Sequence, residues 1–342
     1  MEPDEKDDPL LGAAALVFQT PVRAKQRRAS PKSHTPTMRR ALRLAGAIGQ
    51  ISRVTRRHPE VMVKVTGSAR GLCSIKEHLA YITRNGKIAG ERENGECIES
   101  IRDVRDLAEE WWAEGTDRRA KARDTINLIL SMPPGTDPKA VAEAARAFAH
   151  KTFGGQHDYL LAHHNHDSDP KRPENPHAHL TVKTRGHQGQ WLNPRKADLQ
   201  AWREVFAAEL RERNIIAEAT PRRARGVVRK GKRQAIRHMD ARRASRVTQW
   251  KLMQAVKTAA AHRDESTPEP WVKAAQERQR KVRRAWNTLA DAFDQAGQPT
   301  LAQEIKQFVN TMPPPLTERE HLIKQAKKLL EKRQEQDRGR SR

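Results

Sequence analysis

Cysteine is almost absent from this chain: of its 342 residues, only Cys73 and Cys97 carry a thiol. Two cysteines cannot build the disulfide framework of a small secreted protein, and their spacing fits no zinc-binding pattern. We therefore expect a protein of the reducing cytoplasm. Aromatic residues make up only 4% of the sequence and apolar residues 36%, so part of the chain is expected to lie outside a packed core.

Long apolar runs are missing as well. No segment reaches the ~20 apolar residues of a membrane-spanning helix, which predicts no membrane insertion. The apolar stretch 10–18 is short and follows an acidic start, the opposite of a secretory signal. Acidic residues are fewer than basic ones: the chain has 42 Asp and Glu and 66 Lys and Arg, which gives a formal net charge of +24. Such an excess favours an anionic polymer as the partner.

Composition divides the chain into three segments. Residues 1–57 begin with an acidic tip and then turn basic, which predicts a disordered basic extension with one short helix over 38–51. Residues 58–230 contain alternating strand and helix patterns and are predicted to form one folded domain. Residues 231–342 are charged and rich in helix-forming residues between proline breaks, which predicts a basic helical accessory region.

The middle segment is predicted to be an α+β domain. Apolar and β-branched runs predict strands at 61–65 and 125–131 and near 158–164 and 177–184. Capping residues and apolar spacing predict helices at 74–85, 102–114, 137–152 and 194–212, with a polar loop over 87–100. This order predicts a mainly antiparallel sheet with helices on one face, followed by a helical C-terminal region.

Histidines gather where two of these predicted strands meet. His177 and His179 open one strand two residues apart, so their side chains share a face. His163, His164 and His166 end the strand before it. Three neutral imidazoles with open positions suit a catalytic metal, although histidines in polar loops also bind metals incidentally. His164 is the preferred third ligand because it directly follows the apolar run; His166 would share its face and is the alternative.

Tyrosine is also rare, with only Tyr81 and Tyr159 in the chain. Tyr81 lies in a cationic segment with Arg84 and Lys87. A phenol, with a pKa near ~10, is a weak nucleophile, but nearby cations or a metal-polarised phosphate make attack on phosphorus feasible. Composition alone favours a core role for Tyr81, since apolar residues flank it.

Three segments together resemble the motifs of the HUH endonuclease superfamily, named for its His-hydrophobic-His pair. Within it the chain is similar to the P-type plasmid mobilisation relaxases, most closely to the border-nicking relaxase of T-DNA transfer. Residues 81–87, Tyr-Ile-Thr-Arg-Asn-Gly-Lys, resemble the first motif, and residues 130–137 resemble the second. His177-Ala178-His179 with the upstream histidines resembles the third, and the similarity covers about residues 60–230.

The resemblance implies a DNA relaxase. Such an enzyme nicks one strand at a plasmid or mobile-element transfer origin by metal-dependent tyrosine transesterification, for conjugative DNA transfer. It leaves a 5′-phosphotyrosine link and a free 3′ hydroxyl. By this resemblance Tyr81 is the nucleophile and Ser131 helps to hold the scissile strand. The metal, Mg²⁺ or Mn²⁺, is then bound by His164, His177 and His179.

The same resemblance implies the partners: single-stranded DNA at a transfer origin, relaxosome accessory proteins and a type IV coupling protein. It places the protein in the bacterial cytoplasm, with export alongside the DNA into recipient cells. Predicted DNA contacts are Arg84, Lys87, Arg222 and Arg225. The last two open a basic run that extends to Arg243, which either grips phosphates or is a solvated linker.

Two other functions remain open at this stage. One is a DNA-binding relaxosome component without catalysis, which the basic composition also fits. The other is a rolling-circle replication initiator of the same superfamily. Those initiators usually place the tyrosine after the histidine pair, whereas Tyr81 precedes it, so the relaxase is preferred.

Overall fold

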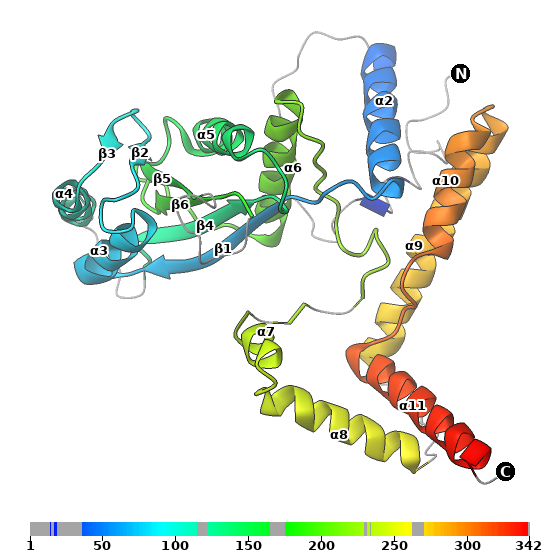
Figure 1. Cartoon of the computed structure of the whole chain (residues 1–342). Coiled ribbons are helices and arrows are strands. Elements are labelled where there is room, and N and C mark those ends of the chain that lie inside the picture. Colours follow the sequence, from blue (N-terminus) through cyan, green and yellow to red (C-terminus); the bar gives the residue numbers. More distant parts are fainter. Residues whose placement is uncertain are drawn as a thin grey trace. The chain divides into compact units, whose positions relative to one another are not determined.

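The computed structural model describes residues 14, 17–18, 36–114, 122–164, 175–228, 231–232, 234–261 and 270–340 (Figure 1). Two compact units make up the chain. The sheet unit comprises Thr20–Thr220, and the helical unit comprises Met1–Gln19 together with Pro221–Arg342. Among the described residues, no helix combines the length and the apolar character that crossing a membrane requires. The domain boundaries predicted from the sequence stay predictions.

A six-stranded sheet forms the centre of the sheet unit, with the order β1-β4-β6-β5-β2-β3. Its strands are β1 (Met62–Ala69), β2 (Gly90–Arg92), β3 (Cys97–Ile98), β4 (Thr125–Ser131), β5 (Tyr159–His164) and β6 (His177–Lys183). All neighbouring pairs are antiparallel, which confirms the predicted α+β class. The segment predicted as a polar loop contains β2 and β3, because strands of three and two residues leave no periodic pattern to detect.

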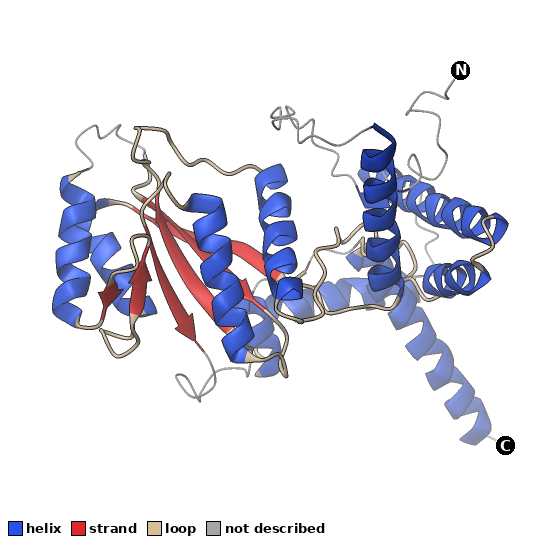
Figure 2. Cartoon of the chain, turned by 90° about the horizontal axis from the view of Figure 1, so that it is seen from above, coloured by secondary structure: helices blue, strands red, loops and turns tan. Residues whose placement is uncertain are grey.

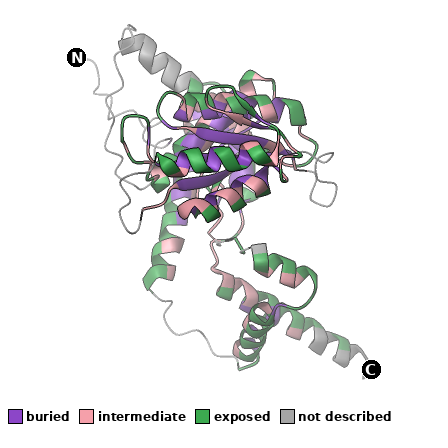
Figure 3. Cartoon of the chain, turned by 90° about the vertical axis from the view of Figure 1, so that its left-hand side faces the viewer, coloured by how far each residue is buried: buried purple, intermediate pink, exposed green. Residues whose placement is uncertain are grey.

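Helices cover both faces of this sheet, not one face as predicted (Figure 2). They are α3 (Gly71–Ile82), α4 (Ile101–Ala113), α5 (Pro138–Phe153) and α6 (Lys196–Glu212), whereas α2 (Pro36–Thr55) precedes β1 and is not part of either sheet core. Strand β5 shows why two layers form. Leu161 joins the core under α5 and α6, whereas Leu160 and Ala162 join a second core with α3 and α4. Because both faces of β5 are apolar, each needs a helical cover, and the central strands β4, β5 and β6 are largely buried (Figure 3).

Helix α3 begins three residues before the predicted Ser74 cap. The Gly71 N–H donates to the Asp124 carboxylate at 2.7 Å, so a residue at the start of β4 caps this helix from a distance. Such a cap satisfies one of the N–H groups that a helix start leaves without a partner. The contact also fixes α3 against the sheet edge at β1.

A partly buried carboxylate ties α4 to the sheet. Asp158, just before β5, accepts the indole N–H of Trp111 at 2.6 Å and a guanidinium N–H of Arg92 at 3.0 Å. Trp111 is 2% exposed, so its N–H needs this acceptor. The three side chains join α4, β2 and β5, and they stabilise the layer that carries α3.

The helical unit contains α7 (Gln234–Ala241), α8 (Arg246–Ala260), α9 (Pro270–Gln295), α10 (Pro299–Asn310) and α11 (Glu318–Arg340), which confirms the predicted helical C-terminal region. Its largest fully buried side chain is Trp286. The indole N–H donates to the Ala224 carbonyl at 2.8 Å, and the ring packs edge-on against Phe308 and Phe18. This unit therefore has an apolar core of its own.

Helix α2 occupies much of the stretch that was predicted as a disordered extension. It is longer than the expected helix over 38–51 and buries Ile51 and Val54. Arg53 pairs with the buried Glu218 at 2.6 Å. Residues 36–57 are therefore ordered within the sheet unit.

Candidate metal and nucleophile site

The register of the sheet brings the predicted histidines together. Strand β6 lies between β4 and β5, and His177 at its start is paired with Ser131 on one side and His164 on the other. His179 follows two residues later and shares the face of His177. The same alternation turns His163 to the opposite face. The face that carries the cluster is the one covered by α3 and α4.

His164, His177 and His179 form a compact cluster. Their ring centroids are 4.8–5.2 Å apart, and one ligand nitrogen from each lies within 4.8 Å of the other two. None of the three is more than 9% exposed. Three imidazoles gathered in this way can bind one divalent ion and leave positions open for a substrate.

One nitrogen of His164 is bound to the backbone. Its Nε2 lies 2.6 Å from the Ile82 carbonyl oxygen, so Nε2 carries the proton and donates it. Its Nδ1 is buried and has no hydrogen-bond partner among the described residues. An unsatisfied buried nitrogen is unfavourable. A metal ion would satisfy this lone pair, and a carbonyl is a common partner for the other nitrogen of a ligand histidine.

The protonation of the cluster also fits metal binding. Burial lowers the pKa of His164 to about 4; the bond to Ile82 opposes this shift, and His177 and Arg84 add to it. The imidazole is thus neutral at neutral pH, the form that coordinates metals. The Nδ1 of His177 lies 2.9 Å from the Asn175 carbonyl. With its proton on Nδ1, His177 offers Nε2 as the ligand atom.

The third-ligand alternative, His166, lies outside the described residues, as do the acidic residues that follow it. His164 completes the described cluster. Its position at the last residue of β5, opposite His177, follows from the strand register. The ligand assignment itself stays a prediction.

Tyr81 lies beside this cluster at the C-terminal end of α3. Its ring meets the ring of His179 edge-on, with centroids 5.9 Å apart. The guanidinium carbon of Arg84 is 5.7 Å from the centre of the Tyr81 ring. The tyrosine is 42% exposed, so it is not a core residue. A phenol in this position is close to a phosphate that the cluster would bind.

A tight turn after α3 leaves one helix carbonyl free to accept a hydrogen bond from the histidine cluster. Arg84 and Asn85 both adopt left-handed backbone angles, with φ of 53° and 58°. The last four carbonyls of a helix lack intrahelical partners. Three of them accept N–H groups from the turn: Leu79 from Thr83 at 3.1 Å, Ala80 from Asn85 at 2.8 Å and Tyr81 from Arg84 at 3.4 Å. The fourth, the Ile82 carbonyl, accepts the proton of His164.

His78 is a neighbour of Tyr81 that the sequence analysis missed. It lies one turn earlier on α3, and the two rings are roughly parallel with centroids 6.2 Å apart. Burial lowers the pKa of His78 to about 4, so this imidazole is neutral. The signal in the sequence was its spacing of three residues from Tyr81, which places both on one helix face.

The other predicted residues are spread more widely. Ser131 is 3% exposed, and its hydroxyl lies 3.3 Å from the Met132 carbonyl. Lys87 is exposed on the turn after α3. Arg222 and Arg225 belong to the helical unit. The roles of these residues on DNA stay predictions.

Comparison with protein families gives one match to this region. The family model described as "Relaxase: MobA/VirD2-like, nuclease domain" matches residues 81–215. The matched stretch begins at Tyr81 and includes β4, β5, β6 and all three clustered histidines.

Two curated proteins are similar to part of this chain. The T-DNA border endonuclease VirD2 of Rhizobium radiobacter is 28% identical over 214 residues, covering 56% of this chain and 48% of the relative. A 43 kDa relaxation protein of Salmonella typhimurium is 26% identical over 170 residues, covering 48% of this chain and 46% of the relative. The chain thus spans about half the length of the curated relatives it matches.

Solved structures give weaker likenesses. A structure described as "Molecular Basis of Vancomycin Resistance Transfer in Staphylococcus aureus" has a TM-score of 0.32 and 17% identity, covering 48% of this chain and 98% of that one. The conjugative relaxase TrwC with mutant OriT DNA has a TM-score of 0.30 and 13% identity, covering 66% and 98%. Scores this low do not identify equivalent residues.

Proposed function

We propose that this protein nicks one strand of DNA at a transfer origin, because residues 81–215 match the model of the MobA/VirD2-like relaxase nuclease family. The product is a DNA end joined to the protein through tyrosine. The observation that carries this proposal is the placement of Tyr81, whose ring lies 5.9 Å from His179 in the histidine cluster. A hydrolytic metal nuclease would not need a tyrosine there.

Tyr81 is the proposed nucleophile. Its phenolic oxygen attacks the scissile phosphorus and loses its proton, the bond between phosphorus and the 3′ oxygen breaks, and the 3′ oxygen leaves as a hydroxyl after taking up a proton. The 5′ phosphate remains on Tyr81 as a diester, so the reverse attack by a 3′ hydroxyl can rejoin the strand. Arg84, whose guanidinium lies over the Tyr81 ring, and Lys87 on the following turn would supply positive charge that attracts the phosphate.

The histidine cluster is the proposed metal site. His164, His177 and His179 would hold Mg²⁺ or Mn²⁺, which supplies Lewis-acid polarisation of the phosphate oxygens when bound. Ser131, paired with His177 across the sheet, would help to hold the scissile strand. Because the cluster is buried, a metal ion bound there would act on the phosphate more strongly than it would in water.

We extend the proposal to the biological setting of the nick. The substrate is single-stranded DNA at the transfer origin of a plasmid or mobile element, and the process is conjugative transfer. Relaxosome accessory proteins and a type IV coupling protein are the proposed protein partners, with export of the protein on its DNA. Arg222 and Arg225 are proposed to contact phosphates, in agreement with the net charge of +24.

A cleavage assay tests the proposal directly. Labelled single-stranded DNA from the origin beside the gene is incubated with the protein and Mg²⁺ or Mn²⁺, then resolved on denaturing gels. We expect a covalent protein–DNA adduct with the native chain and with Tyr159→Phe, which changes the other tyrosine of the chain. Tyr81→Phe should bind the DNA without forming an adduct.

Other outcomes identify other functions. Cleavage without an adduct would indicate a hydrolytic nuclease. Binding without cleavage by the native chain, across origins and metals, would favour the relaxosome component that lacks catalysis. An adduct that persists in Tyr81→Phe would reject this nucleophile.

A further inference from the structure

Helix α8 of the helical unit exposes several large apolar side chains. Its buried residues are Ala255 and Ala259. The apolar residues that are 39–60% exposed are Val247, Trp250, Leu252, Met253 and Val256. Four of them, Val247, Trp250, Met253 and Val256, recur every third residue, so each lies next to the following one in a row that winds around the helix. Single apolar residues on a surface are normal, but a continuous apolar row indicates an interaction site.

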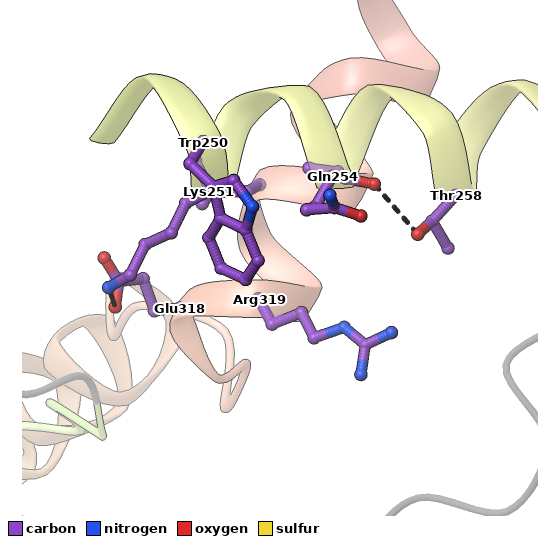
Figure 4. A pocket seen from close by; sticks show the side chains of 8 residues that line it. Trp250, Lys251, Gln254, Thr258, Glu318 and Arg319 are labelled. Atoms are coloured by element: carbon purple, nitrogen blue, oxygen red, sulfur yellow. Dashed lines mark hydrogen bonds and ion pairs between the residues drawn. The ribbon is translucent and has the colours of Figure 1, made fainter. Parts of the chain in front are cut away.

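A cavity lies beside this row, between α8 and α11. Its volume is about 360 Å³, and Trp250, Gln254 and Thr258 line it from α8. Glu318 and Arg319 line it from α11, and Figure 4 shows the Trp250 ring at its edge near Arg319. A hollow next to an apolar row can accept a side chain from a partner.

The charged residues of α8 itself are all cations. Helix α8 carries Arg246, Lys251 and Lys257 and contains no carboxylate. The carboxylate of Glu318 on α11 pairs with Lys251 at 2.8 Å. Lys257 is exposed one turn after Met253, on the apolar face itself. A partner that covers this face must therefore bring apolar and acidic groups together.

We propose that the row on α8 and the adjoining cavity, named here the α8 face, bind an amphipathic acidic helix of a partner protein. From Val247 to Val256 the row is about 13 Å long at ~1.5 Å per residue, which matches between two and three turns of a facing helix. The partner's apolar stripe packs against the row and one of its side chains enters the cavity. Its carboxylates meet Arg246 and Lys257. This inference does not depend on the nicking activity.

Other occupants fit the face less well. A second copy of the chain would oppose the same three cations of α8. Single-stranded DNA stacks its bases on aromatic rings, but only Trp250 in the row is aromatic. A lipid surface needs an uninterrupted apolar face, whereas Gln249 and Lys257 are exposed within this one.

Peptide binding to the full chain tests the proposal. Three fluorescent helical peptides share one apolar stripe and differ only in a polar face made of Glu, Gln or Lys. Anisotropy titrations should give the order Glu, Gln, Lys, with the Glu peptide bound at least tenfold more tightly than the Lys peptide. Met253→Ala and Trp250→Ala should each weaken the Glu peptide at least fivefold. Lys257→Glu should remove most of the preference for the acidic peptide.

Trp271→Ala is the matched control, because Trp271 is 68% exposed but lies on α9. It should leave every affinity unchanged. Equal binding of the three peptides, no binding of any, or an equal loss in Trp271→Ala would overturn the proposal. So would Trp250-dependent binding of a single-stranded oligonucleotide or of phosphatidylglycerol vesicles when the Glu peptide does not bind. Circular dichroism of each variant checks that the helices are retained.

Discussion

The Nε2 nitrogen of His164 lies 2.6 Å from the carbonyl oxygen of Ile82, the residue that follows Tyr81. One hydrogen bond thus links a proposed metal ligand to the helix end that carries the proposed nucleophile. It holds the His164 ring with Nδ1 directed at the cluster. Any movement of the α3 end that displaces Tyr81 also disturbs the orientation of this ligand. We therefore expect metal binding and nucleophile position to be coupled.

Replacement of His164 should weaken metal binding before any chemistry is considered. We expect His164→Ala to lower the affinity for Mn²⁺ at least tenfold by calorimetry without DNA, because one of three nitrogen ligands is lost. His163→Ala is the matched control, because the side chain of His163, next to His164 in the strand, points to the opposite sheet face. The Mn²⁺ affinity of this variant should equal that of the native chain. If His166→Ala loses the metal and His164→Ala keeps it, the third ligand has been assigned to the wrong histidine.

The sequence predicted which histidines share a strand face but not the contact that orients His164. Strand alternation was enough to separate His164 from His163, because side-chain direction follows the period of a strand. A backbone acceptor such as the Ile82 carbonyl has no residue signature, so only the tertiary structure reveals it. The early start of α3 escaped prediction for the same reason, since its cap, Asp124, is 53 residues away.

In the sheet, too, features set by neighbouring residues could be predicted, whereas features set by distant segments could not. Strand β4 was predicted over its full span, residues 125–131, because a β-branched and apolar run ends at a proline pair. Whether helices cover one sheet face or two depends on both faces of β5, where Leu160 and Leu161 enter different cores. A continuous apolar run indicates this burial, but it does not say which helices provide it.

Gly86 in the turn after Tyr81 should tolerate no side chain. Its φ is +82°, and a Cβ there would lie 2.5 Å from the Ile101 nitrogen, which is backbone and cannot rotate away. We expect Gly86→Ala to lower the free energy of unfolding by ~1–2 kcal/mol for the left-handed backbone, and further because α4 must shift. Gly95 has nearly the same φ, +85°, and open space where a Cβ would lie. Gly95→Ala should therefore lower the free energy of unfolding only by the cost of the left-handed backbone. Urea unfolding measures both, and equal losses would mean that the contact with α4 is unimportant.

Glu209 should make the sheet unit less stable in acid. Burial alone would raise the pKa of this carboxyl, but hydrogen bonds and charges from Lys151 and Arg213 outweigh burial and lower the pKa. Because the folded pKa lies below the unfolded value, the ionised form stabilises the fold at neutral pH. That stabilisation is lost as the pH falls through the folded pKa.

The measurement is the free energy of urea unfolding from neutral pH to about pH 3, compared between the native chain and Glu209→Gln. Their difference should shrink toward acid. Glu109→Gln serves as the control, since Glu109 pairs with Lys76 on the surface and is 59% exposed. A constant difference for Glu209→Gln would show that its ion pairs do not contribute to the pH dependence.

A chain that ends at Thr220 should fold and cut DNA by itself. Residues 218–220 are tied to the segment before β1: the Val61 N–H donates to the Glu218 carbonyl at 2.9 Å, and the Thr220 N–H donates to the Glu60 carboxylate at 2.8 Å. A chain that ends at Asn214 loses these bonds and the buried Ala217 and Ala219, so it should unfold more readily. The chain that ends at Thr220 should keep oligonucleotide cleavage. Conjugative transfer should fall, because this chain lacks the α8 face. A folded chain ending at Thr220 that binds metal but does not cut would mean that the helical unit supplies part of the nuclease site, with Arg222 and Arg225 as its first candidates.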